Sequence, residues 1–153
     1  MTGMTTEVTS AGTSGTPSPS ATSSPRVLLY SDDRTVREQV RLAVGPRLHA
    51  GAPDIVWAEA ATAAAVVDKA DNETWDLLVL DGEADQAGGM GLCRQLKNEI
   101  YECPPVLVLT GRPADAWLAT WSLADGVVAR PLDAVKVQEA VAHLLTPSTA
   151  GTA

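Results

Sequence analysis

Basic residues are scarce in this chain of 153 residues: 11 Lys and Arg stand against 19 Asp and Glu, and the formal net charge is −8. Contact with a nucleic-acid backbone requires clustered Lys and Arg, so this deficit disfavours direct nucleic-acid binding. Hydrophobic runs near 18 residues are also missing, which argues against a membrane-spanning helix. We expect an acidic, soluble protein that binds other proteins, cations or small ligands.

Cysteine is equally rare, since Cys93 and Cys103 are the only two. The N-terminus has neither the basic start nor the apolar stretch of a signal peptide. Two thiols in a chain without an export signal are typical of a reduced, cytoplasmic protein, and no further metal ligands lie near this pair in the sequence. We therefore expect buried or incidental thiols rather than a redox or metal site.

The two ends of the chain differ in composition from its middle. Residues 1–25 and 146–153 consist almost entirely of Thr, Ser, Gly, Ala and Pro, which bury too little apolar surface to offset the entropy lost on ordering. We predict disordered tails there and one folded domain over 26–145. With 45% hydrophobic residues, the chain has enough apolar material for a single core.

Within that domain, short apolar runs alternate with segments whose apolar residues recur at helical spacing. The runs predict strands at 26–30, 54–58, 76–80, 105–110 and 126–129. The periodic segments predict helices around 36–44, over 60–70, at about 89–99 and 114–124, and around 137–145. Strict alternation, with strands that are apolar throughout, predicts a doubly wound α/β domain. Its parallel five-stranded sheet would be covered on both faces, in the flavodoxin-like order 2-1-3-4-5.

Polar residues follow four of these strands. Strand one leads into Asp32 and Asp33, strand three into Asp81, strand four into Thr110 and strand five into Arg130. Carboxyl ends of parallel strands meet at one edge, where such folds bind ligands. Three carboxylates there would repel one another unless a cation lies among them, and Mg²⁺ suits a site of few oxygen ligands. A carboxylate beside Mg²⁺ can attack a phosphoryl group, whose oxygens a hydroxyl and a cation would hold.

A simpler interpretation makes each aspartate a helix cap or a turn residue on an unrelated protein of the same fold. It explains Asp33 or Asp81 singly, but not the three acids together with Thr110 and Arg130. In this order and at these strand ends, the residues resemble those of a response-regulator receiver domain, across essentially all of 26–145.

The resemblance implies a role for each of these residues. Asp32 and Asp33 match the metal-binding acidic pair, Asp81 matches the phosphoacceptor, and Glu83 falls where the family offers a backbone carbonyl to Mg²⁺. Thr110 matches the switch hydroxyl. In "LLVLDGEADQAGG", the last glycine stands at the family's glycine position, and "ARPLD" matches the Lys-Pro motif, whose proline normally follows a cis bond.

Three features depart from the family pattern. Arg130 stands where the family has lysine, and its planar fork is longer and bulkier than an ammonium group. Val127 occupies the position of the switch aromatic. The turn "GEADQAGG" lacks the usual Met-Pro pair, and Gly82 and Asp85 are compatible with a looser turn.

Two functional hypotheses remain. In one, a histidine kinase or a small phosphodonor phosphorylates Asp81 in the presence of Mg²⁺, and the only catalysis is self-catalysed phosphoryl transfer and hydrolysis. In the other, the receiver is degenerate and acts as a constitutive adaptor or accessory subunit. Because only a short polar tail follows the last helix, we expect output through protein association. Receivers use the face of the fourth helix, fifth strand and fifth helix, where Trp121 is the expected partner contact.

The Ala-rich, Phe-free composition also resembles that of actinobacterial orphan receivers. Some of these are linked with proton-pumping NADH dehydrogenase. An accessory role on this respiratory complex (complex I), peripheral to the membrane, is therefore an alternative that rests on resemblance alone.

Overall fold

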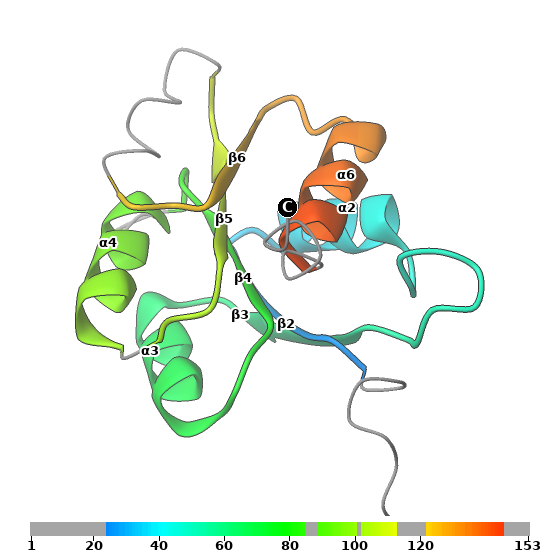
Figure 1. Ribbon diagram of the computed structural model, residues 1–153. Helices are drawn as coiled ribbons and strands as arrows, with labels where there is room; N and C mark the ends of the chain where they lie inside the picture. Colours follow the sequence, from blue (N-terminus) through cyan, green and yellow to red (C-terminus); the bar gives the residue numbers. More distant parts are fainter. Residues whose placement is uncertain (1–23, 85–88, 101, 113–121, 146–153) are drawn as a thin grey trace, which may run out of the picture.

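The computed structural model describes residues 24–84, 89–100, 102–112 and 122–145. Its strands are Arg26–Tyr30 (β2), Val56–Ala60 (β3), Leu77–Asp81 (β4), Val106–Thr110 (β5) and Gly126–Ala129 (β6), and its helices are Arg34–Val44 (α2), Ala63–Asn72 (α3), Gly89–Glu99 (α4) and Ala134–Leu145 (α6). All neighbouring strands pair in parallel, in the order β3-β2-β4-β5-β6. Figure 1 shows α2 and α6 on one face of the sheet and α3 and α4 on the other. The fold prediction is confirmed, including the strand order 2-1-3-4-5.

The central strands are apolar throughout because both of their faces are buried. Successive side chains of a strand point to opposite faces. In β2, Val27 and Leu29 therefore join the cluster under α2 and α6, whereas Leu28 and Tyr30 join the cluster under α3 and α4. β4 and β5 divide their side chains in the same way and are buried along their whole length.

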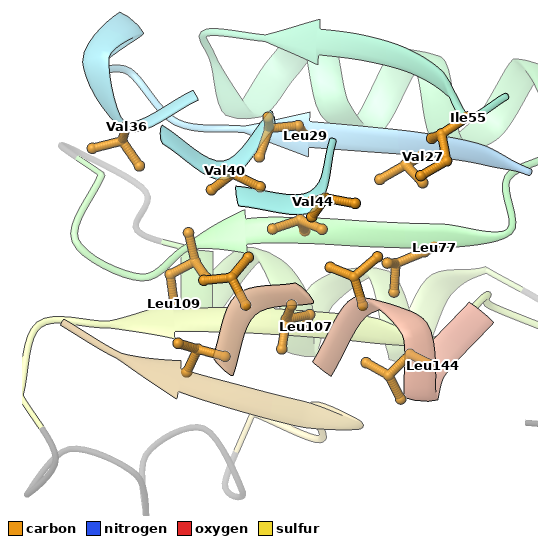
Figure 2. Packing of buried hydrophobic residues seen from close by; sticks show 14 residues of the cluster. Val27, Leu29, Val36, Val40, Val44, Ile55, Leu77, Leu107, Leu109 and Leu144 are labelled. Atoms are coloured by element: carbon orange, nitrogen blue, oxygen red, sulfur yellow. The ribbon is translucent and has the colours of Figure 1, made fainter. Parts of the chain in front are cut away.

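Helical spacing supplies the other half of each core. Val36, Val40 and Val44 lie on the buried side of α2, and Val137 and Val141 on the buried side of α6. Figure 2 shows α2 valines and Leu144 of α6 over the side chains that this face of the sheet provides. Burial of the two layers against the central strands fixes where each strand ends, and therefore where the polar residues after it lie.

The second strand is displaced from its predicted position at 54–58 and runs over Val56–Ala60. It is an edge strand in which only Ala60 is buried, so its hydrophobic pattern is weak. Its register is set by the backbone, because the amide of Val56 donates to the carbonyl of Pro25. The following helix begins at Ala63 rather than at residue 60, with Thr62 as its N-cap.

Several predictions fall on residues outside the described part: the tails up to residue 23 and from residue 146, and most of the helix at 114–124 with Trp121. The predicted end of this helix at residue 124 is wrong. Residues 122–123 form a turn, in which Leu123 has a φ of 73°. None of the helices in the described ranges combines the length and apolar character needed to cross a membrane.

Truncation of a central side chain should be far more costly than truncation of an exposed one. Leu78 is 0% exposed in β4, whereas Leu42 on α2 is 82% exposed. We expect Leu78→Ala to lower the free energy of unfolding by about 2–5 kcal/mol, because it leaves a cavity in the core. Leu42→Ala should change it by less than about 0.5 kcal/mol. Urea unfolding of both variants measures the difference, and equal losses would contradict the assigned core.

Candidate functional site

The register of the parallel sheet brings polar residues from four strands to one edge. Tyr30 pairs with Leu80, so the next residues, Ser31 and Asp81, leave β2 and β4 side by side. Thr110 ends β5 beside Ala129, and the amide of Arg130 donates to the carbonyl of Thr110 at 2.9 Å. This is the carboxyl edge at which doubly wound sheets place their ligand sites.

Asp81 is the centre of this edge and is only 2% exposed. Its Oδ2 accepts a hydrogen bond from the hydroxyl of Ser31 at 2.7 Å. Its Oδ1 accepts from the backbone amide of Glu83 at 2.9 Å and from Nη2 of Arg130 at 2.8 Å. Both oxygens are thus occupied, and the negative charge has a cationic partner. Asp81 and Arg130, which the sequence places at the same edge, are in direct contact, and their predicted roles toward a phosphoryl group stay predictions.

Ser31 is a site residue that the sequence reasoning missed. It is fully buried, and its Oγ also accepts a hydrogen bond from the amide of Asp33 at 3.0 Å. The available signal was position, because Ser31 directly follows a buried strand and has the same side-chain direction as Val27 and Leu29. It therefore lies on the same face of the sheet as Asp81, which follows Leu77 and Val79 on that face of β4.

A cluster of charges on α2 and β3 fixes the backbone at Ser31. Nη1 of Arg37 donates to the carbonyl of Ser31 at 2.6 Å, and its Nε donates to Glu59 at 2.8 Å. Arg41 donates to the other Glu59 oxygen at 2.7 Å. Partial desolvation raises the pKa of Glu59, but hydrogen bonds from Arg37 and Arg41 outweigh it and bring the pKa below its ordinary value. The side chain of Arg37 is only 15% exposed in this cluster.

The acidic pair lies at the predicted edge, but its two members have different surroundings. Asp33 is the N-cap of α2, and its Oδ1 accepts from the amide of Thr35 at 2.8 Å. This is the helix-capping role that an aspartate commonly takes. Asp32 is exposed to solvent. The metal-binding roles of Asp32, Asp33 and Glu83 stay predictions.

Thr110 and Glu83 lie at the same edge. No described contact joins the side chain of either residue to Asp81. The hydroxyl of fully buried Thr110 donates to the carbonyl of Arg112 at 3.2 Å. The Glu83 carboxylate lies against Gly111, where an added Cβ would come within 2.6 Å of the carboxyl carbon. The loops after β4 and β5 are therefore in direct contact above the site.

Arg130 contributes a partly buried guanidinium, 27% of its side chain being exposed. Its Nε is buried and makes no hydrogen bond within the described ranges. The Arg130–Pro131 peptide bond is cis, as the resemblance implied. A buried donor without a partner is costly, at about 1–3 kcal/mol, so Arg130 has capacity for a further acceptor.

The side chains described at this edge offer few ligands to a divalent metal ion. Among the described residues, no three His, Cys, Asp or Glu side chains are grouped so that they could hold one. Both oxygens of Asp81 have protein partners, and one Asp33 oxygen caps a helix. The predicted Mg²⁺ cofactor therefore stays an expectation from the resemblance.

Comparison with known proteins decides the family. The chain is 46% identical over 127 residues to response regulatory proteins of Mycobacterium tuberculosis strains CDC 1551 and H37Rv. The match covers 83% of this chain and 96% of each relative. The chain belongs to the response-regulator family. No protein-family model matches this chain.

Solved structures of receivers share its fold. A CheY-like receiver domain from Methanospirillum hungatei JF-1 has a TM-score of 0.67 at 19% identity, covering 84% of this chain and 99% of that chain. A Francisella response-regulator receiver domain has a TM-score of 0.68 at 17% identity, covering 81% and 98%. The chain is thus a response-regulator receiver with a flavodoxin-like fold.

The two cysteines lie away from this edge and belong to the core under α3 and α4. Burial raises the pKa of Cys93 to about 11 and also raises that of Cys103. Both are therefore protonated thiols at neutral pH and poor nucleophiles.

Gly89 sets the distance between α4 and the site. A Cβ at this position would lie 2.5 Å from the carbonyl oxygen of Asp81, whereas a Cβ at Gly91 in the same helix would meet nothing within 4 Å. We expect Gly89→Ala to lower the free energy of unfolding by about 1–3 kcal/mol, since backbone must shift. Gly91→Ala should raise it by up to about 1 kcal/mol through helix propensity. Urea unfolding of this matched pair checks both signs, and a neutral Gly89→Ala would contradict the close approach.

Proposed function

We propose that this receiver accepts a phosphoryl group on Asp81 and signals by association with other proteins. The observation that supports this best is the guanidinium of Arg130. It donates one hydrogen bond to Asp81 through Nη2, while its buried Nε makes none within the described residues. Arginine forks bind phosphate oxygens through pairs of N–H groups, so Arg130 is suited to hold a phosphoryl group on the neighbouring carboxylate.

The proposed reaction is direct phosphoryl transfer. One carboxylate oxygen of Asp81 forms a bond to phosphorus, and the bond between phosphorus and the donor breaks. The leaving group departs with the electron pair, and Asp81 becomes an acyl phosphate. The donor is a phosphohistidine of a kinase or a small acyl phosphate. Arg130 and the hydroxyl of Thr110 would then hold phosphoryl oxygens, as hydrogen-bond donors do in other phosphoryl-transfer sites.

Association is proposed to use the face that includes β6 and α6. Val127 is 40% exposed on β6. It lines a hollow of about 750 Å³ between this strand and α6, together with Arg130, Lys136 and His143. Because Arg130 reaches both the hollow and Asp81, a change at the acceptor can alter this surface directly. Trp121 stays a predicted partner contact, since it lies outside the described residues.

A constitutive adaptor is the second candidate function. It is favoured by the 2.8 Å pair between Arg130 and Asp81, which already neutralises the site in the unmodified protein. A receiver in this state needs no phosphoryl group to remain folded and to present its surface. Association with respiratory NADH dehydrogenase is one version of this candidate and still rests on the resemblance alone.

The acceptor can be tested with acetyl phosphate as the donor. We expect the wild-type protein to gain the mass of one phosphoryl group and Asp81→Asn to gain none, because an amide oxygen is a far weaker nucleophile. Intact-protein mass spectrometry, followed by hydroxylamine to cleave an acyl phosphate, measures both. Asp54→Asn is the matched control, because Asp54 is an exposed aspartate paired with Arg47. A phosphoryl group that persists in Asp81→Asn would place the acceptor elsewhere.

Co-purification separates the two candidate functions. If phosphorylation controls association, the set of proteins captured by the wild type should change when acetyl phosphate is added, and Asp81→Asn should not respond. If the receiver is a constitutive adaptor, capture should be the same for the wild type, for Asp81→Asn and for both conditions.

A further inference from the structure

We infer that Arg130 and Ser31 take the place of a divalent cation at Asp81, so that this receiver does not bind Mg²⁺ with a dissociation constant below ~1 mM, the weak end of the range for biological Ca²⁺ sites. The inference concerns the same site as the proposed function, but it depends only on the unmodified protein.

Oδ2 of Asp81 is directed toward the end of β2. A metal ion shared between β2 and β4 would need this oxygen, together with oxygens from the loop after β2. The hydroxyl of Ser31 donates to Oδ2 at 2.7 Å. Ser31 is fully buried, and the Arg37 contact to its carbonyl holds its backbone. A neutral donor thus occupies the position from which an additional carboxylate would have helped to bind a cation.

The positive charge of Arg130 also opposes a divalent ion at Asp81. Nη2 of Arg130 lies 2.8 Å from Oδ1, and this guanidinium is permanently protonated. A divalent ion on the same carboxylate would be repelled by it at short range, where the partly buried surroundings screen charge weakly. A lysine ammonium is compact and flexible enough to move aside, whereas the planar guanidinium is bulky and held by its fork. Arg130 therefore opposes metal binding by charge and by volume.

Few ligands remain for a metal ion at this edge of the sheet. Mg²⁺ usually keeps several waters and is held by one or two carboxylates, so Asp81 would need at least one further oxygen ligand from the protein. Asp33 uses Oδ1 to cap α2. The other predicted ligands are Asp32, which is exposed to solvent, and the backbone carbonyl of Glu83. The described residues contain no group of three acidic, His or Cys side chains that could hold an ion. The site therefore has the hydroxyl of Ser31 where a second buried carboxylate would help to bind an ion, and the guanidinium of Arg130 adds a positive charge that opposes it.

Two substitutions should create the missing metal site. Ser31→Asp puts a second carboxylate beside Asp81, so the variant should unfold at a lower temperature in EDTA and recover on addition of Mg²⁺. Arg130→Lys keeps the charge but removes the bulk, and it should bind Mg²⁺ at least 10-fold more tightly than the wild type. Arg47→Lys, at an exposed pair with Asp54, is the matched control and should behave as the wild type.

Binding is measured by calorimetric titration with MgCl₂ and by thermal unfolding in Mg²⁺ and in EDTA. The inference holds if the wild type shows no saturable binding below ~1 mM and at least one variant does. It is overturned if the wild type binds in that range. It is also overturned if neither variant exceeds the wild type, since Ser31 and Arg130 would then not be what excludes the ion. If Ser31→Asp fails to fold, Arg130→Lys decides alone.

The result is independent of the phosphorylation test. A wild type that gains no phosphoryl group with or without Mg²⁺ would refute the proposed acceptor while leaving the binding comparison intact. A wild type that is phosphorylated only with Mg²⁺ and binds it below ~1 mM would refute the inference alone.

Discussion

The burial of one carboxylate is the constraint on which this edge of the sheet depends. A buried charge without partners is strongly destabilising, and the loss of one partner from a buried ion pair typically costs several kcal/mol. Asp81 is 2% exposed and meets this constraint with a hydroxyl, a backbone amide and a guanidinium. These partners come from the ends of β2, β4 and β6, so the carboxylate is satisfied only when the strands pair in register.

The fold was predictable because the sheet is buried on both faces. Strands such as β4 and β5 are apolar at every position, and helices such as α2 carry valines at a spacing of four residues; neither pattern has a good alternative in a chain of this length. The edge strand β3 was placed two residues early because only Ala60 of this strand is buried. Its position is set by a backbone hydrogen bond to Pro25. A backbone contact of this kind cannot be recognised from the hydrophobicity of the side chains.

The site was predictable in part, and the limit has a physical cause. Residues at strand ends can be read from the sequence, so the meeting of Asp81 and Arg130 at one edge was foreseen. Which residue of the "SDD" stretch faces Asp81 depends on the strand register, because a shift of one residue reverses side-chain direction. The register directs Ser31 to Asp81, whereas Asp33 begins the helix as its cap. Capping explains Asp33, but it does not account for Asp81 and its three partners.

The ion pair also shapes how modification would act on the receiver. In the unmodified protein, Nη2 of Arg130 donates a hydrogen bond to Asp81, and the buried Nε has no described partner. The charges of the pair cancel, but one hydrogen-bond donor of Arg130 stays unused. A phosphoryl group on Asp81 would add acceptors and negative charge where that donor lies, and it would compete for the Nη2 now held by the carboxylate. Arg130 also lines the hollow between β6 and α6, so a reorientation of its side chain would change this outer surface. The same arginine that we infer to take the place of a metal ion would therefore connect the acceptor to the proposed partner-binding face.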